Sequence, residues 1–382
     1  MMAKMTQKFH LAFVCLMVLL VCLSSCMEKP PIRIGLAAQL TGKQADLGIQ
    51  LRNGVQLAVD EINVSGGING RNLELIFEDD LGIPQGAKDA QNKLIDKGVV
   101  AIIGHFTSDQ TLAGYEVAHK RGVLLFSATA STALMSGIED LFYRTVSSTD
   151  ALGSGLATYI IEDRSISTIA IIYDEDNNSY SEPLANSFTD TYRKSGGIIT
   201  HVEKFSSSQD ADYSQSVAKM KNSLADAVLI IASPHDTALI AQTIHLQNWA
   251  PELFTSAWAQ SETLFQTGGQ TLEGMETIVG FDVNDQTPEL DEFKQKYQQI
   301  YQTHPIFSAM EGYETMHMLA VALQKTNGSA ENLGEELVGI QDFIGLSGPV
   351  KLDAYGDVIR NLAIQKVIDG EFVTIKKLEI AQ

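Results

Sequence analysis

The chain has 382 residues, too many for one ordinary domain and enough for two of roughly 100–200 residues each. Hydrophobic residues make up 45% and charged residues 19%, which excludes a mainly disordered, collagen-like or coiled-coil protein. The formal net charge is -20 and no basic stretch is present, which argues against a nucleic-acid partner because such surfaces need clustered Lys and Arg.

The first 25 residues are predicted to be a secretory signal. Lys4 and Lys8 precede an apolar run over residues 11–23, which is shorter than the ~20 residues that span a bilayer. The run ends in Leu-Ser-Ser-Cys, which resembles the bacterial lipobox, in which the Cys receives a diacylglycerol and becomes the new N-terminus. We therefore expect Cys26 to be lipidated, residues 26–30 to form a tether, and the protein to be exported to the periplasm or cell surface and anchored to a membrane.

All three cysteines, Cys15, Cys22 and Cys26, lie in this first segment. Once residues 1–25 are removed and Cys26 carries a lipid, no free thiol remains. This excludes a Cys nucleophile, a disulfide framework and a Cys metal site in the mature chain. No later apolar run is long enough to cross a membrane.

From residue 31 onward, apolar strand-like segments alternate with segments of helical period. In the first block, helices are expected to start at Pro84 and Ser108, the second ending at Gly122. The expected strands of both blocks are 32–38, 72–77, 99–103, 123–126, 168–173, 198–205, 227–232 and 253–256. Two such blocks predict an α/β protein with two doubly wound lobes, each built on a parallel sheet.

The C-terminal third is less regular. It predicts long helices over 288–301 and 307–324 and short strands over 348–352, 362–369 and 372–378. This tail is too small for a third lobe of the same kind. We expect it to complete the first two lobes by crossing between them.

Motifs for catalysis and for nucleotide binding are absent from the sequence. There is no G-x-G-x-x-G after the first strand, no G-x-x-x-x-G-K-[ST], no G-x-S-x-G and no H-E-x-x-H. His105 is predicted to be a satisfied structural histidine, and the carboxylates at 78–80 to be a solvated strand end. The sequence thus predicts a protein that is not an enzyme and that holds no cofactor and no metal.

Small hydroxyl residues follow three strands of the first block, at Thr41, at Thr107 with Ser108, and at 127–129. In open α/β sheets, ligands bind beyond the carboxyl ends of the strands. Ser108 begins a helix, so its hydroxyl and the free backbone N–H groups can face an anion. The alternative is that these hydroxyls only cap helices.

Several stretches together resemble the branched-chain amino-acid-type (Leu/Ile/Val-binding) substrate-binding proteins of ABC transporters. They are 32–35, 41–42, 66–71, 78–80, 103–105, 127–130, 144–145 and 348–350. The most specific is Gly-Gly-Ile-Asn-Gly-Arg at 66–71. The resemblance implies the type I periplasmic binding protein fold, with crossovers near Ser147, Gly280 and Ala354. It implies that residues 31–147 plus 281–354 form lobe 1, and residues 148–280 plus 355–382 form lobe 2.

The resemblance also implies which residues hold the ligand. In lobe 1 these are Ser108, Ser127, Ala128 and Thr129, which would hold a carboxylate. In lobe 2 they are Tyr180, Ser233 and Trp258. Trp258 departs from the family pattern, because relatives carry at the matching position a Glu that holds the ammonium of the ligand. Leu47 also departs, because relatives often carry an aromatic residue there.

The departure at Trp258 leaves three alternatives for the ligand. Trp258 can attract an ammonium through its ring, or Glu311 or Asp282 reaches into the site. Otherwise the ligand is an aromatic or aliphatic carboxylate that is not an amino acid. In each case the resemblance implies capture of a small carboxylate by a monomer that delivers it to the permease of an ABC importer. A ligand-sensing or regulatory envelope lipoprotein on the same fold is the alternative function.

The lipobox generates a first prediction. Cys26→Ser removes the thiol that receives the lipid, so the variant is expected to remain unlipidated and to leave the membrane fraction. Metabolic labelling with radioactive palmitate measures this directly. Labelling of the variant at the level of the wild-type protein would contradict the assignment of Cys26.

Overall fold

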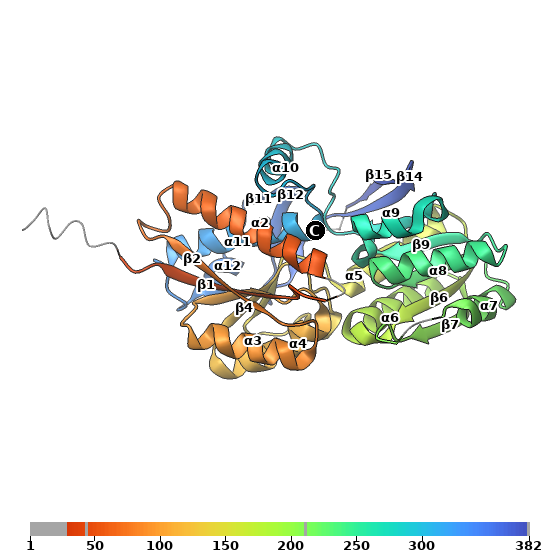
Figure 1. Ribbon diagram of the computed structural model, residues 1–382, viewed down its shortest axis with the longest axis horizontal. Coiled ribbons are helices and arrows are strands. Elements are labelled where there is room, and N and C mark those ends of the chain that lie inside the picture. The colour runs from red at the N-terminus through yellow and green to blue at the C-terminus, as the bar shows by residue number, and fades with distance from the viewer. Residues whose placement is uncertain (1–28, 43–44, 210–211, 380–382) are drawn as a thin grey trace, which may run out of the picture.

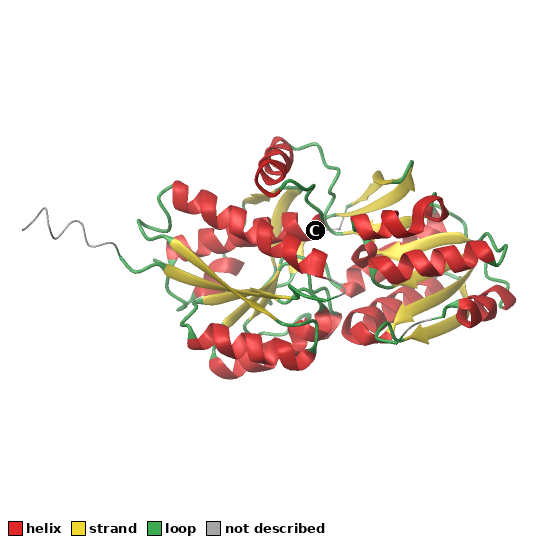
Figure 2. Ribbon diagram, viewed as in Figure 1, coloured by secondary structure: helices red, strands yellow, loops and turns green. Residues whose placement is uncertain are grey.

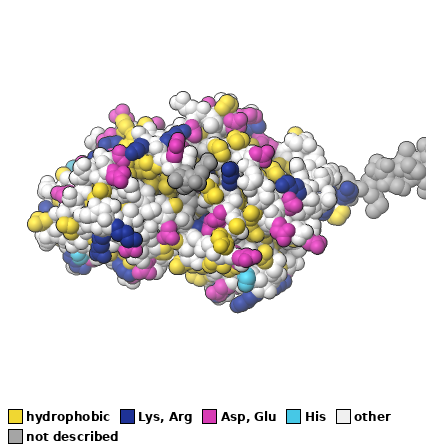
Figure 3. All heavy atoms as spheres, turned by 180° about the vertical axis from the view of Figure 1, so that it is seen from behind, with side chains coloured by type: hydrophobic (Ala, Val, Ile, Leu, Met, Phe, Trp, Pro, Cys, Tyr) yellow, Lys and Arg dark blue, Asp and Glu magenta, His cyan; other side chains and the backbone are white. Residues whose placement is uncertain are grey.

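The computed structural model describes residues 29–42, 45–209 and 212–379 and shows two lobes side by side along the long axis (Figure 1). The predicted signal segment and the lipidation site Cys26 lie outside the described residues. Among the helices that are described, none combines the length and hydrophobicity needed to cross a lipid bilayer. On the face drawn in Figure 3, Lys and Arg side chains are scattered among Asp and Glu and form no continuous basic area.

Lobe 1 is built on a parallel five-stranded sheet in the order β2-β1-β3-β4-β5. Its strands are β1 (Ile32–Ala38), β2 (Leu73–Asp79), β3 (Ala101–Gly104), β4 (Leu124–Ser127) and β5 (Phe142–Arg144). Helices α3 and α4 cover one face, and α2 and α11 cover the other (Figure 1). The helices of this lobe are α2 (Ala45–Val64), α3 (Pro84–Asp96), α4 (Ser108–Arg121), α10 (Pro288–Tyr301), α11 (Phe307–Lys325) and α12 (Leu333–Val338).

Lobe 2 is built on a seven-stranded sheet in the order β15-β14-β10-β9-β8-β6-β7. Its strands are β6 (Thr168–Asp174), β7 (Ile198–Phe205), β8 (Ala227–Ile231), β9 (Glu252–Ser256), β10 (Glu276–Val279), β14 (Leu362–Ile368) and β15 (Glu371–Leu378). Five are parallel, and β14 and β15 add an antiparallel edge. The helices are α5 (Thr149–Glu162), α6 (Asn178–Lys194), α7 (Ser214–Asn222), α8 (Pro234–Leu246) and α9 (Glu262–Gly268). Figure 2 shows helices packed around the sheet of each lobe.

Local sequence explains several element boundaries. Helices α3 and α8 each begin with a proline, whose fixed φ suits the first helical position. Helix α4 ends at Gly122, which adopts the left-handed conformation with φ 66° that a side chain would disfavour. The start of α4 at Ser108 and its end at Gly122 confirm the sequence prediction.

The chain crosses between the lobes three times. The first two crossings fall at 145–148 and 280–287, the segments in which the sequence places them at Ser147 and Gly280. The third lies later than the predicted Ala354. Residues 353–357 form a turn, in which Asp353 Oδ1 accepts hydrogen bonds from the backbone N–H groups of Tyr355 and Asp357. This turn returns the chain along the small sheet of β11 (Phe343–Gly345), β12 (Gly348–Leu352) and β13 (Val358–Ile359), so lobe 2 resumes at β14 rather than at Tyr355.

A buried ion pair connects the crossing segments. Arg360 Nη1 donates to Glu314 Oε1 at 2.8 Å and to the carbonyl oxygen of Thr145 at 3.1 Å. The guanidinium carbon of Arg360 lies 5.2 Å from the ring centre of Phe281. Thr145, Phe281 and Arg360 belong to the first, second and third crossing, and Glu314 belongs to α11. One guanidinium therefore contacts all three crossings.

The C-terminal segment of lobe 1 packs tightly on the N-terminal segment through α2 and α11. A Cβ atom built on Gly54 of α2 would overlap the carbonyl oxygen of Ala309 on α11. Since the clash is with backbone, a side chain at position 54 would push the two helices apart.

Gly54→Ala is therefore expected to destabilise the protein by about 1–3 kcal/mol, the usual cost of overpacking a core. The midpoint of urea unfolding measures this. Gly339→Ala is the matched control, because Gly339 has an ordinary helical φ of -69° and its nearest neighbour would lie 3.2 Å away. Equal midpoints for the two variants would contradict the close approach of α2 and α11.

Candidate ligand-binding site

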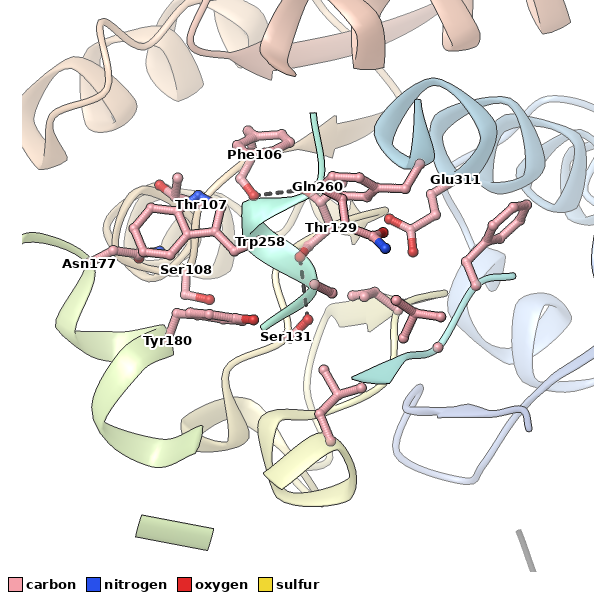
Figure 4. A pocket seen from close by; sticks show the side chains of 17 residues that line it. Phe106, Thr107, Ser108, Thr129, Ser131, Asn177, Tyr180, Trp258, Gln260 and Glu311 are labelled. Atoms are coloured by element: carbon pink, nitrogen blue, oxygen red, sulfur yellow. Dashed lines mark hydrogen bonds between the residues drawn. The ribbon is translucent and has the colours of Figure 1, made fainter. Parts of the chain in front are cut away.

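A cavity lies between the lobes, at the carboxyl ends of the parallel strands of both sheets (Figure 4). The cavity has a volume of about 40 Å³. Lobe 1 contributes Phe106, Ser108 and Thr129 from loops and helix starts after its strands, and Phe307 and Glu311 from α11. The main side chains from lobe 2 are Asn177, Tyr180, Trp258 and Gln260, and Phe281 of the second crossing completes the wall.

Ser108 is the first residue of α4 and is 2% exposed. The cap of this helix is Thr107, and neither hydroxyl makes a capping hydrogen bond. Ser108 Oγ is buried in the cavity wall without a hydrogen-bond partner. A buried polar atom without a partner is costly, so this hydroxyl is available to a ligand rather than used as a cap. Beside a helix N-terminus it suits an anion.

Thr129 also lines the cavity, but its hydroxyl is already used. Thr129 Oγ1 donates to the carbonyl oxygen of Phe106 at 2.7 Å (Figure 4). With its proton engaged, this oxygen can accept a hydrogen bond from a ligand but cannot donate one to a carboxylate. Of the three hydroxyls expected to hold the carboxylate, those of Ser108, Ser127 and Thr129, only that of Ser108 both lines the cavity and is free to donate.

Lobe 2 contributes two aromatic side chains in edge contact. The ring centres of Tyr180 and Trp258 lie 5.6 Å apart at an interplanar angle of 75°. Burial raises the pKa of the Tyr180 phenol to about 12, against the opposing effect of Ser256 and the Trp258 backbone beside it. Tyr180 is thus a neutral donor at the same end of the cavity as Ser108 (Figure 4).

Glu311 is the only acidic side chain among the described residues that line the cavity, and no Lys, Arg or His is found among them. It is 4% exposed and its Oε2 has no hydrogen-bond partner. Burial raises the pKa of Glu311 well above its usual value, although attraction by Arg360 acts in the opposite direction. Glu311 and Asp282 were the two acids considered as partners for a ligand ammonium in place of an acid at position 258. Of these two, Glu311 reaches the cavity.

Asp282 does not line the cavity. Its Oδ1 accepts hydrogen bonds from Thr374 Oγ1 at 2.6 Å and from Gln365 Nε2 at 3.2 Å. These bonds tie the start of the second crossing to the antiparallel edge of lobe 2, so Asp282 has a structural role.

Three further residues expected at the ligand lie elsewhere. Ser127 Oγ accepts a hydrogen bond from the backbone N–H of Ala130 at 2.9 Å, and Ala128 is fully buried beside it. Ser233 caps α8, because its Oγ accepts from the N–H of Asp236 and donates to Asp236 Oδ2 at 2.6 Å. Ser233 lines a separate hollow with Leu47, so the geometry corrects its expected place in the cavity wall.

The lobes touch beside the cavity through the first turns of two helices. The carboxylate of Asp109 on α4 accepts hydrogen bonds from the hydroxyl and the backbone N–H of Ser179 on α6. In return the N–H of Asp109 donates to Asn177 Oδ1 at 3.4 Å. An acid of lobe 1 therefore lies at the N-terminus of a lobe 2 helix, where the helix dipole favours negative charge.

The family follows from comparison with known proteins. A family model described as periplasmic binding protein matches residues 31–371. The chain belongs to this family. As expected from the sequence, its relatives are substrate-binding proteins rather than enzymes. A Leu/Ile/Val-binding protein of Rhizobium johnstonii is 32% identical over 216 residues, which cover 56% of this chain and 58% of the relative. The chain thus spans a little over half the length of this curated relative.

Solved structures share the fold over most of the chain. A leucine-binding protein from Thermotoga maritima matches with a TM-score of 0.84 and 23% identity, covering 91% of this chain and 99% of that one. A solute-binding protein of an ABC transporter from R. palustris, in complex with benzoate, matches with a TM-score of 0.83 and 17% identity, covering 92% and 98%. These likenesses confirm the predicted type I periplasmic binding protein fold.

Sequence reasoning missed several residues of the cavity of this periplasmic binding protein. Phe106, Ser131, Gln260 and Phe281 all follow closely after the carboxyl end of a strand, so the rule that identified Ser108 could have found them. Phe307 lies at the start of α11, where no strand precedes it. His105 is structural, as predicted, because its ring contacts Asp80 and Gln91 in the core. The carboxylates at 78–80 were predicted to form a solvated strand end, and this is wrong for Asp80, which is 1% exposed, whereas Glu78 pairs with Lys97.

The contact between α4 and α6 generates a prediction. Ser179→Ala removes the hydroxyl that bridges the lobes to Asp109, so the ligand-free variant is expected to spend less time closed. Small-angle X-ray scattering should give it a larger radius of gyration than the wild-type protein. Ser206→Ala is the control, since it removes a comparable bond to Asp176 within lobe 2. An unchanged radius in Ser179→Ala would show that this contact does not hold the lobes together.

Proposed function

We propose that this chain is the solute-binding protein of an ABC importer, captures a small carboxylate between its lobes and presents the closed form to a membrane permease. The observation that carries the proposal is the unpaired hydroxyl of Ser108, buried at the N-terminus of α4 inside the cavity between the lobes. A carboxylate placed there would accept a hydrogen bond from this hydroxyl and another from Tyr180. The same proposal includes a lipid anchor at Cys26 and a monomeric protein.

Closure follows from the distribution of contacts. Ser108 belongs to lobe 1, whereas Tyr180 and Trp258 belong to lobe 2, so a ligand that touches all three favours the form in which the lobes meet. A ligand shifts such an equilibrium only by its difference in affinity for the two forms. The aromatic contacts, available only on closure, provide that difference.

The ligand is an amino acid or another carboxylic acid. Relatives support both classes, since one is a Leu/Ile/Val-binding protein and a structural neighbour holds benzoate. In this chain the side chains of Phe106, Trp258, Phe281 and Phe307 offer apolar surface to either kind of ligand.

A thermal-shift screen of amino acids and of aromatic and aliphatic carboxylates tests the proposal. A ligand present at 100 times its Kd should add roughly 2.7 kcal/mol to the free energy of unfolding. A screen in which none of these compounds raises the melting temperature would contradict the proposed function.

Ser108→Ala is expected to weaken binding of the best carboxylate by roughly ten- to a hundredfold, because a hydrogen bond to a charged group contributes about 1.5–3 kcal/mol. Its melting temperature without ligand should stay near that of the wild-type protein, because the hydroxyl caps nothing. Isothermal titration calorimetry measures the affinity.

Ser233→Ala is the matched control for this experiment. It removes a true helix cap, so it should lower stability by about 1 kcal/mol and leave affinity unchanged. An affinity of Ser108→Ala equal to that of the wild-type protein would remove the main support for carboxylate capture at α4.

A further inference from the structure

The charge of the cavity restricts its ligand further. The described lining holds one acid, Glu311, and no basic side chain. A ligand that carries only a carboxylate would bring a second acid into a cavity without a cation. A zwitterion is neutral overall and can supply the partner that Glu311 lacks.

The two polar ends of the cavity lie apart. In Figure 4, Ser108, Tyr180 and the ring of Trp258 are on one side, Glu311 is on the other, and Thr129 lies between them. Ser108 begins α4, whereas Glu311 lies on the second turn of α11, which covers the other face of the lobe 1 sheet. In an α-amino acid the ammonium and the carboxylate are attached to the same carbon. Such a ligand holds its two charged groups close together, whereas a longer ligand can extend one toward Ser108 and the other toward Glu311.

The protein itself leaves Glu311 without a full partner. The guanidinium of Arg360 makes its ion pair with Glu314, at 2.8 Å. The amide of Gln260, which also lines the cavity, donates through Nε2 to Gln365 Oε1. Glu311 Oε2 remains buried and unpaired. A buried carboxyl group in this position is costly unless a ligand pairs with it.

We propose that Glu311 determines specificity by receiving a positively charged group at the far end of the ligand. The preferred ligand is then a carboxylate whose ammonium is separated from it by an apolar stem, rather than an α-amino acid. Trp258, Phe281 and Phe307 line the cavity as surfaces for such a stem, and aromatic faces also attract an ammonium. This inference rests on the proposed capture of a carboxylate at Ser108.

Three sets of compounds with equal chain length test it. They are the ω-amino acids γ-aminobutyrate, δ-aminovalerate and ε-aminocaproate, their isomers α-aminobutyrate, norvaline and norleucine, and the parent acids butyrate, valerate and caproate. Calorimetry on the wild-type protein should show the best ω-amino acid binding at least about tenfold more tightly than both its isomer and its parent acid, a factor equivalent to 1.4 kcal/mol.

Glu311→Gln keeps the size of the side chain and removes its charge. In this variant the preference for the ω-amino acid over the parent acid should disappear, while the parent acid binds at least as well as before. Asp282→Asn is the matched control, because it neutralises a buried acid that is outside the cavity. It should keep the preference. The melting temperature of each variant without ligand reports whether it is folded.

The outcomes separate this inference from the proposed function. If parent acids or α-amino acids bind as tightly as the ω-amino acids, or if Glu311→Gln keeps the preference, the inference is wrong and carboxylate capture stands. If compounds from the wider screen bind but no ω-amino acid does, the inference is equally wrong. If no carboxylate of any kind binds, both proposals fail.

Discussion

The cavity depends on the three crossings of the chain between the lobes, which fix how the two sheets face each other. Each lobe directs the carboxyl ends of its parallel strands toward the gap that the chain crosses three times. Loops that follow strands and the first turns of helices therefore meet there, with their free backbone N–H groups and short hydroxyl side chains. Arg360 contacts all three crossings, so the segments that join the lobes are held together next to Phe281 of the cavity wall.

Local rules explain what the sequence could predict. Ser108 follows a buried strand and starts a helix, and both signals are readable from neighbouring residues. Ser233 shows the limit of this reasoning, because a helix cap and a ligand-binding hydroxyl have the same local signature, and only the partner Asp236 separates them. The third crossing was predicted too early because the turn at 353–357 returns the chain to pair with β12 through the two-residue strand β13, which the sequence prediction did not include. Glu311 and Asp282 were equivalent in sequence. Their difference comes from which partners the tertiary structure brings to each.

Among the described residues that line the cavity, the one acidic side chain, Glu311, lies on lobe 1, the lobe that also carries Ser108. Ser108 and Glu311 both belong to lobe 1, whereas Tyr180 and Trp258 supply mainly aromatic surface from lobe 2. In an open form, lobe 1 alone would satisfy both charged ends of the proposed ligand. Lobe 2 would then add the Tyr180 hydroxyl and aromatic contacts and exclude water.

The packing of α2 on α11 also has a consequence for the order in which the protein folds. These helices belong to segments separated by the main part of lobe 2, so the core of lobe 1 lacks one side until the chain has been completed past Lys325. Contacts between such distant segments are slow to form because a long loop must close first. During synthesis, residues 149–279 are available as a nearly complete unit well before lobe 1 is. Until α11 has been synthesised, the N-terminal segment of lobe 1 therefore exposes apolar surface of its sheet. Chaperones would bind the chain during this interval.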